Sequence, residues 1–433
     1  MAYRNKLNHT QPATISSYKK TTLANGVRVL SEEIPSVKSA SIGIWINTGS
    51  RNETPENNGI SHFIEHMLFK GTKKRNFQQI AQSLESVGGY MNAFTSKEHT
   101  CYYARVLDEF VEEAVDVLSD MVLNSTFPVK EMEKEKTVVL EEIKRSEDDP
   151  DDLVHEYFEK HIYGNHPFGR PIIGTAENIK AFTRDNLFNY TRSFYSNENV
   201  ILTAAGNLTH NQLVKLAEKY LNRKRKREGK RKSFQTTKQK HLAYRQAGFS
   251  KEYVKPIQQA HLCTGTIAFN VHNKMRYPGL VMNSVLGDGM SSRLFQQIRE
   301  KHGLAYSVYS FLTMMKETGV FGVYVGTDKN SVQNAIELTY NELHKLKTKP
   351  LATTELKRAK AQLKGSMLMS LESTSNRMMR LGNGELYFGE YMTLDSIVKN
   401  IDSVSVEDVQ KVAQTLFSVE DFTTVVLSPE NKN

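Results

Sequence analysis

The sequence contains few cysteines and no long apolar run, and these two shortages exclude several classes of protein. Only Cys101 and Cys263 of its 433 residues are cysteines, which is too few for a disulfide framework. No stretch approaches the roughly 18 uncharged apolar residues of a membrane helix. No apolar segment follows the basic residues near the start, as it would in a secretory signal. We therefore expect a soluble, cytoplasmic protein without a membrane partner.

The sequence also lacks a general excess of charge, although its formal net charge is +9. Residues 223–240 contain ten lysines and arginines and one glutamate, which leaves 47 basic and 47 acidic residues in the rest of the chain. This segment has no apolar periodicity, so we interpret it as a solvated basic linker. Binding of nucleic acid or of an acidic membrane through this segment is the less favoured alternative, because the charge is confined to one place.

The linker lies near the middle of a chain that is long enough for two domains of about 200 residues each. We expect a first domain over residues 1–222 and a second over residues 241–433. The two halves carry similar strings in the same order, which indicates an internal duplication. The matched pairs are residues 77–80 with 295–298, Tyr90 with Tyr306, residues 101–106 with 320–325, the helical pattern from Val111 with that from Val332, and Pro128 with Pro350.

Within each half, runs typical of strands alternate with amphipathic patterns typical of helices. Strands are predicted over residues 27–34, 39–48, 199–208 and 260–271. Pairs of such strands followed by pairs of helices favour an α+β fold. We predict two homologous domains, each a mostly antiparallel sheet packed with helices.

The segment 56–72 carries the pattern with the most specific chemistry. Its apolar residues recur at the spacing of a buried helix face. His62 and His66 are four residues apart, so their imidazoles lie on one face of the helix and can share a tetrahedral zinc ion. Glu65 completes the His-x-x-Glu-His order of the inverted zincin motif, in which a carboxylate takes a proton from the activated water. Two unrelated surface histidines are the alternative, and the complete string argues against it.

A third metal ligand must come from another segment. Residues 129–148, opened by Pro128, form a predicted helix that holds six glutamates. Glu135 and Glu142 are seven residues apart, two turns along one face and separated by about 10 Å of rise. One could bind the metal while the other supports a histidine through a hydrogen bond, and spacing alone does not decide between them.

Several strings resemble the pitrilysin/insulinase family of zinc peptidases, in particular the branch of the bacterial processing proteases and the β subunit of the mitochondrial processing peptidase. The resemblance is carried by GISHFIEHMLFKGT at 59–72, GGYMNAFTSKEHTCYYARVL at 88–107, EKTVVLEEI at 135–143, HPFGRPIIGT at 166–175 and SSRLFQQIREKHGLAYSVYS at 291–310. These strings span nearly the whole chain in the order expected for the family.

The resemblance implies a metalloendopeptidase with one zinc ion per chain. It implies that Glu142 joins His62 and His66 as the third zinc ligand and that Glu65 is the general base. It also implies that Glu135 supports one of the zinc ligands without binding the metal itself.

The resemblance also implies substrate contacts away from the metal. Asn92 and Ala93 match an edge strand that holds extended peptides, and Arg299 and Tyr306 match a pair that contacts the substrate or the developing oxyanion. Without the family context, Asn92 would be a turn residue, Arg299 a surface residue and Tyr306 a core residue. The family's usual tyrosine after Ala93 is Phe94 here, so whatever that hydroxyl binds needs another partner.

The second half has no copy of the predicted metal site. Residues 280–288, which align with the metal-binding helix, lack both histidines and the glutamate, and Lys364 stands near the position of Glu142. Relatives of this length pair two chains around a chamber, so the resemblance implies a homodimer that cleaves short or unfolded peptides. The rival interpretation is a non-catalytic structural subunit, like the core subunits of respiratory complexes, which tend to have degraded metal motifs.

Overall fold

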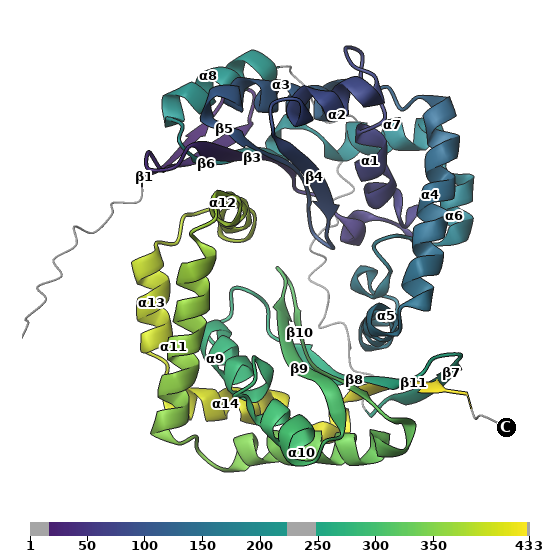
Figure 1. Ribbon diagram of the computed structural model, residues 1–433, viewed down its shortest axis with the longest axis vertical. Coiled ribbons are helices and arrows are strands. Elements are labelled where there is room, and N and C mark those ends of the chain that lie inside the picture. Colours follow the sequence, from purple (N-terminus) through teal and green to yellow (C-terminus); the bar gives the residue numbers. More distant parts are fainter. Residues whose placement is uncertain (1–16, 223–247, 431–433) are drawn as a thin grey trace, which may run out of the picture.

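The computed structural model describes residues 17–222 and 248–430, and each half of the chain forms one sheet (Figure 1). The strands of the first sheet are β1 (Ser17–Thr22), β2 (Arg28–Glu33), β3 (Ser39–Ile46), β4 (Tyr90–Thr95), β5 (Thr100–Leu107) and β6 (Val200–Gly206). Those of the second are β7 (Ser250–Lys255), β8 (Ala260–Ala268), β9 (Ala305–Met314), β10 (Gly319–Thr327) and β11 (Thr423–Pro429). The basic segment 223–240 lies outside the described residues, so the linker stays a prediction.

The two sheets have the same topology. The strand orders are β1-β2-β6-β3-β5-β4 and β7-β11-β8-β10-β9, so every strand of the second sheet has a counterpart in the first. In each sheet one pair is parallel, β2 with β6 or β7 with β11, and the remaining pairs are antiparallel. The predicted α+β class and the predicted pair of homologous domains are therefore confirmed.

Helices cover both sheets. In the first half they are α1 (Ile60–Leu68), α2 (Phe77–Glu85), α3 (Val111–Asn124), α4 (Val129–Asp148), α5 (Pro150–Tyr163), α6 (Ala176–Ala181), α7 (Arg184–Phe194) and α8 (His210–Tyr220). In the second half they are α9 (Arg276–Gly287), α10 (Val332–Thr348), α11 (Thr353–Ser370), α12 (Thr374–Phe388), α13 (Leu394–Asp402) and α14 (Val406–Leu416), with a π-helix over Phe295–Lys301. Within the described ranges, no helix combines the length and apolar character needed to cross a bilayer.

Two of these helices are exchanged between the halves (Figure 1). Helix α5 belongs to the first half but packs on β8 and β11, where Val154 and Phe158 are buried in the same apolar cluster as Val425. Helix α12 belongs to the second half but packs on β2, β3 and β6, where Met378 contributes to the cluster around Trp45. Each sheet is thus covered on one face by helices of its own half and on the other by a helix of the opposite half.

The turns at the ends of two equivalent hairpins also join the halves. Glu98, in the turn between β4 and β5, is only 4% exposed. Its carboxylate accepts hydrogen bonds from the backbone N–H of Lys316 at 3.2 Å and from the guanidinium of Arg51 at 2.5 Å. Arg51 also pairs with Glu317 at 2.7 Å, and both Lys316 and Glu317 lie in the turn between β9 and β10. This charge cluster holds the β4–β5 turn against the second half.

Candidate metal centre

Helix α1 is held in place by its buried face and by a buried carboxylate at its N-terminus. The predicted apolar face is almost fully buried, with Phe63, Ile64 and Met67 at 0% exposure. The Glu53 side chain accepts hydrogen bonds from the backbone N–H groups of Gly59 and Ser61, both at 2.8 Å. These bonds satisfy donors that the first turn of a helix leaves free. The opposite side of α1 is therefore fixed where it presents the two histidines of the predicted motif.

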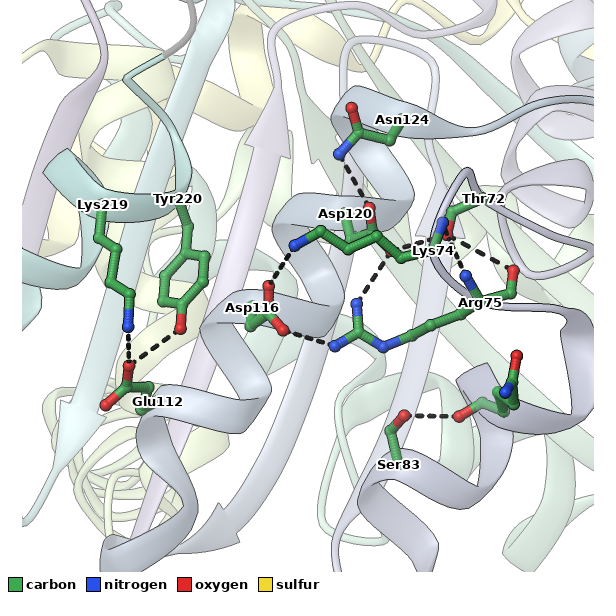
Figure 2. A network of polar contacts seen from close by, with 11 residues as sticks. Thr72, Lys74, Arg75, Ser83, Glu112, Asp116, Asp120, Asn124, Lys219 and Tyr220 are labelled. Atoms are coloured by element: carbon green, nitrogen blue, oxygen red, sulfur yellow. Dashed lines mark hydrogen bonds and ion pairs between the residues drawn. The ribbon is translucent and has the colours of Figure 1, made fainter.

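The loop that follows α1 is tied to α3 by a polar network (Figure 2). The guanidinium of Arg75 binds Asp116 at 2.5 Å and Asp120 at 2.9 Å, and the Thr72 hydroxyl donates to Asp120 at 2.6 Å. The Asp120 side chain is only 1% exposed, so this network joins the loop to the core of the first half rather than to its surface. Both ends of α1 are thus anchored.

The structure brings His62, His66 and Glu142 together. One ligand atom from each lies within 4.8 Å of the other two, and within the described residues no other group of three side chains meets the same criterion. The Glu142 carboxylate on α4 lies 3.9 Å from Nε2 of His62 and 3.5 Å from Nε2 of His66. Zinc ligands about 2.1 Å from the ion are roughly 3.4 Å apart in a tetrahedron. Two imidazoles and one carboxylate at these distances fit a zinc ion.

The electrostatics of the two histidines differ. Burial, and secondarily the neighbouring His66, lowers the pKa of His62 to about 3, so His62 is the neutral imidazole that a metal requires. Burial also acts to lower the pKa of His66, but the hydrogen bond to Glu135 and the charges of Glu142 and Glu65 outweigh it and raise that pKa. The carboxylates around His66 therefore attract positive charge to this point.

A second carboxylate orients His66 from behind. Oε1 of Glu135 lies 2.9 Å from Nδ1 of His66, and Oε2 accepts from the Lys70 ammonium at 2.7 Å. Burial acts to raise the pKa of Glu135, but its bonds to His66 and Lys70 prevail and lower it. A hydrogen bond of this kind fixes the ring so that Nε2 faces the Glu142 carboxylate. Nδ1 of His62 is buried and has no such partner among the described residues.

Glu65 points from the same face of α1 toward strand β4. Its Oε2 accepts a hydrogen bond from the Thr95 hydroxyl at 2.5 Å. Burial is the main cause of a raised pKa for this carboxyl, and the Thr95 bond opposes the shift. Glu65 makes no ion pair with either histidine, and its carboxyl group lies close enough to His66 and Glu142 to feel the charges of both.

Asn92 and Ala93 lie in β4, which is an edge strand of the first sheet. The alternative of a turn residue at Asn92 is therefore wrong. The Asn92 side chain donates to the Tyr90 hydroxyl at 2.6 Å and accepts from the N–H of Ala93 at 2.8 Å. Because that N–H bonds to a side chain, it belongs to the edge of the strand that faces away from β5.

Arg299 and Tyr306 lie in the second half and contact each other. The guanidinium of Arg299 lies 4.8 Å from the centroids of the Tyr306 and Phe295 rings. Tyr306 is 78% exposed, so its alternative interpretation as a core residue is wrong. Within the described residues of one chain, neither forms a hydrogen bond or ion pair with Glu65 or the three candidate ligands.

Three supporting residues were missed by the sequence reasoning. Glu53 gives a weak signal, because an acidic residue shortly before a helix favours its N-terminus. Lys70 and Thr95 lie within the segments 59–72 and 88–107 that carry the family resemblance. Nothing in their spacing indicates that they contact Glu135 and Glu65.

The chain is similar to known proteins over nearly its whole length. Residues 28–176 match the family model described as "Insulinase (Peptidase family M16)", and residues 181–363 match "Peptidase M16 inactive domain". The chain is 45% identical over 414 residues to the "Uncharacterized zinc protease YmxG" of Bacillus subtilis, covering 95% of this chain and 98% of that protein. It is 39% identical over 400 residues to the "Uncharacterized zinc protease SCO5738" of Streptomyces coelicolor, covering 92% and 87%.

Solved structures share the fold. A protease from Helicobacter pylori has a TM-score of 0.88 at 22% sequence identity, covering 96% of this chain and all of that chain. A structure from Pseudomonas fluorescens titled as a peptidase M16 inactive domain has a TM-score of 0.86 at 21% identity, covering 96% and 99%.

Proposed function

Because this chain belongs to peptidase family M16, the insulinase family, and its relatives are named zinc proteases, we propose that it is a zinc-dependent endopeptidase whose metal is held by His62, His66 and Glu142. The convergence of these three ligand atoms within 4.8 Å, from two separate helices, is the observation that carries the proposal. A zinc ion at this position, when bound, supplies a Lewis acid that polarises the peptide carbonyl and lowers the pKa of water.

The residues around the proposed metal then have separate roles. Glu65 accepts the proton of the attacking water and can return it to the leaving amine. Glu135, held by Lys70, keeps the His66 ring in its binding orientation. The second half holds no such set of ligands among its described residues, so we assign one zinc ion to each chain.

Strand β4 is the proposed binding surface for the substrate. A peptide in extended conformation can add to the outer edge of β4, where the N–H of Ala93 would exchange its bond to the Asn92 side chain for one to the peptide. The resulting main-chain hydrogen bonds depend little on the sequence of the peptide. Such binding requires an unfolded segment, so we propose that the substrates are short or unfolded peptides.

We also propose that two chains form a homodimer around a shared chamber. Arg299 and Tyr306 do not contact the metal site of their own chain, and the exposed Tyr306 side chain is available to a neighbouring molecule. In a dimer these two side chains would face the zinc of the partner chain. Sedimentation velocity should show a dimer with peptidase activity, and a fully active monomer would refute the shared chamber.

The metal assignment is tested by a matched pair of substitutions. Glu142→Gln should lose zinc, measured by elemental analysis of the purified protein, together with hydrolysis of a quenched-fluorescent peptide mixture. Glu141→Gln changes the adjacent residue, which is exposed and paired with Lys144, so it should keep both. Loss of zinc from both variants, or from neither, would contradict the assignment.

The role of the base is tested separately. Glu65→Gln should retain zinc and lower kcat by about 10²–10⁴-fold, which is the usual contribution of a general base. A chelator should abolish hydrolysis by the unaltered protein. Near-normal turnover by Glu65→Gln would refute the role of Glu65, and chelator-resistant hydrolysis would refute the metal mechanism.

A further inference from the structure

The carboxylate of Glu65 is held by a side chain from the proposed substrate-binding strand. Thr95 is the last residue of β4, and its hydroxyl donates to Oε2 of Glu65 at 2.5 Å. Within the described residues this is the hydrogen bond that Glu65 makes, so Oε1 stays available for another donor. The glutamate side chain has three rotatable bonds. A hydrogen bond from a fixed donor removes most of this rotational freedom.

Thr95 is itself held in a rigid frame. The turn that follows it is closed by a hydrogen bond from the N–H of Ser96 to the carbonyl of His99 at 2.8 Å. The N–H groups of Ser50 and Arg51 donate to the carbonyls of Ser96 and Lys97 at 3.2 and 2.9 Å. The buried Glu98 then joins the turn to the second half. A β-branched side chain on such a backbone has little choice of χ1 angle.

The approach of the 49–51 loop to this turn depends on glycine. A Cβ atom on Gly49 would lie 2.3 Å from the carbonyl oxygen of Ser96, which is far closer than any real contact. The loop can therefore reach the turn only because residue 49 has no side chain. The turn next to Thr95 is therefore held by the 49–51 loop and by the second half, and not by its own hairpin alone.

We propose that Thr95 is a positioning residue for Glu65: its hydroxyl fixes one carboxylate oxygen so that the other faces the attacking water. This inference rests on the proposed function, because it assigns Thr95 a role through the base. It also couples substrate binding to the base, since the strand whose edge would pair with the peptide ends in the residue that holds Glu65. A peptide in register with β4 is then automatically in register with the base.

The test compares Thr95→Val, which keeps the shape without the hydroxyl, with Thr95→Ser, which keeps the hydroxyl. A hydrogen bond to a charged group contributes enough to rate that Thr95→Val should lower kcat by about 10- to 100-fold. KM should stay within about threefold of the unaltered protein, because the side chain does not form the outer edge of the strand. Thr95→Ser should restore kcat to within about threefold.

Zinc affinity gives a readout that does not depend on turnover. Thr95 touches none of the three ligands, so Thr95→Val should bind zinc within about threefold of the unaltered affinity in competition with a chelator. The matched control is Thr100→Val on β5, whose hydroxyl lies 3.4 Å from that of Thr95 and does not contact Glu65. Its kcat should stay within about threefold of normal.

Three results would overturn the proposal. Thr95→Val could retain normal kcat, it could lose zinc affinity or raise KM in parallel with the loss of kcat, or Thr95→Ser could fail to restore the rate. Thr95→Ala replaces the valine variant if the latter does not fold, with the same expected outcome. Normal activity of Glu65→Gln would instead refute the proposed function. Failure of the proposed function and failure of the role of Thr95 are therefore distinguishable.

Discussion

The exchange of helices between the halves can be tested at a single glycine. Gly382 lies on α12, where the helix from the second half crosses the sheet of the first. A Cβ atom at this position would lie 2.1 Å from Cε2 and 2.4 Å from Cζ2 of Trp45. Carbon atoms in contact are about 3.5–4.0 Å apart. Gly382→Ala therefore requires α12 to withdraw by roughly 1.5 Å or the Trp45 ring to turn.

The magnitude follows from three contributions. Forcing a methyl group into a packed interface costs about 1–3 kcal/mol. Turning the Trp45 ring would break its hydrogen bond to the Thr203 hydroxyl at 2.9 Å, which is worth about 1 kcal/mol. Alanine has a better helix propensity than glycine, which returns about 1 kcal/mol. We expect Gly382→Ala to lower the free energy of unfolding by about 2 kcal/mol.

The assay uses the protein's own fluorescence, because Trp45 is the sole tryptophan of the chain. In a urea titration followed by tryptophan emission, the midpoint for Gly382→Ala should fall by roughly 0.5 M. The matched control is Gly384→Ala on the same helix, where the nearest atom to the added Cβ is 3.5 Å away. This variant should be stabilised by up to about 1 kcal/mol through helix propensity alone. Equal midpoints for the two variants would refute the close contact between α12 and the first sheet.

Two further predictions concern the stability of the first half. Arg75→Ala should lower the free energy of unfolding by about 3 kcal/mol, because it leaves the buried Asp120 carboxylate without its cation. Lys74→Ala changes an exposed side chain and should alter the free energy of unfolding by less than about 0.5 kcal/mol. Equal losses for the two variants in urea titrations would contradict this prediction. Burial, reinforced by the charge of Lys316, lowers the pKa of His99 to about 4 in the folded chain, against about 6.5 when unfolded. The unfolded chain therefore binds the extra proton between these values, and stability falls as the pH drops from about 6.5 to 4. His99→Phe should remove about 2 kcal/mol of the stability lost between pH 7 and pH 4.5, and an unchanged loss would show that this histidine does not contribute.

Elements with strong local signals were predicted well. The helix predicted over residues 129–148 is α4 with the same bounds. Its start is fixed by Pro128, because proline is favoured at the beginning of a helix, where its missing N–H costs no hydrogen bond. The helix that carries the two histidines spans Ile60–Leu68, the residues over which the predicted apolar face runs. Gly59 adopts a φ of +98° and interrupts the helical path, and residues 55–57 form a separate 3₁₀ turn.

Contacts between distant segments could not be predicted from periodicity. The apolar stripes of α5 and α12 indicate that each helix has a buried face, but a stripe carries no information about which sheet covers it. The same holds for the choice between Glu135 and Glu142. Both lie on one face of α4, and only the placement of α4 against α1 decides that Glu135 meets Nδ1 of His66 while Glu142 meets the Nε2 atoms.

The exchange of α5 and α12 has a consequence for biosynthesis. A ribosome releases the first sheet long before it releases residues 374–388, so the surface around Trp45 emerges without the helix that will cover it. The nascent first half therefore carries an uncovered apolar face, of the kind that chaperones bind, until nearly the whole chain has been made. Neither half can cover the second face of its own sheet, and a chain severed in the middle would need both fragments present together to recover the native state.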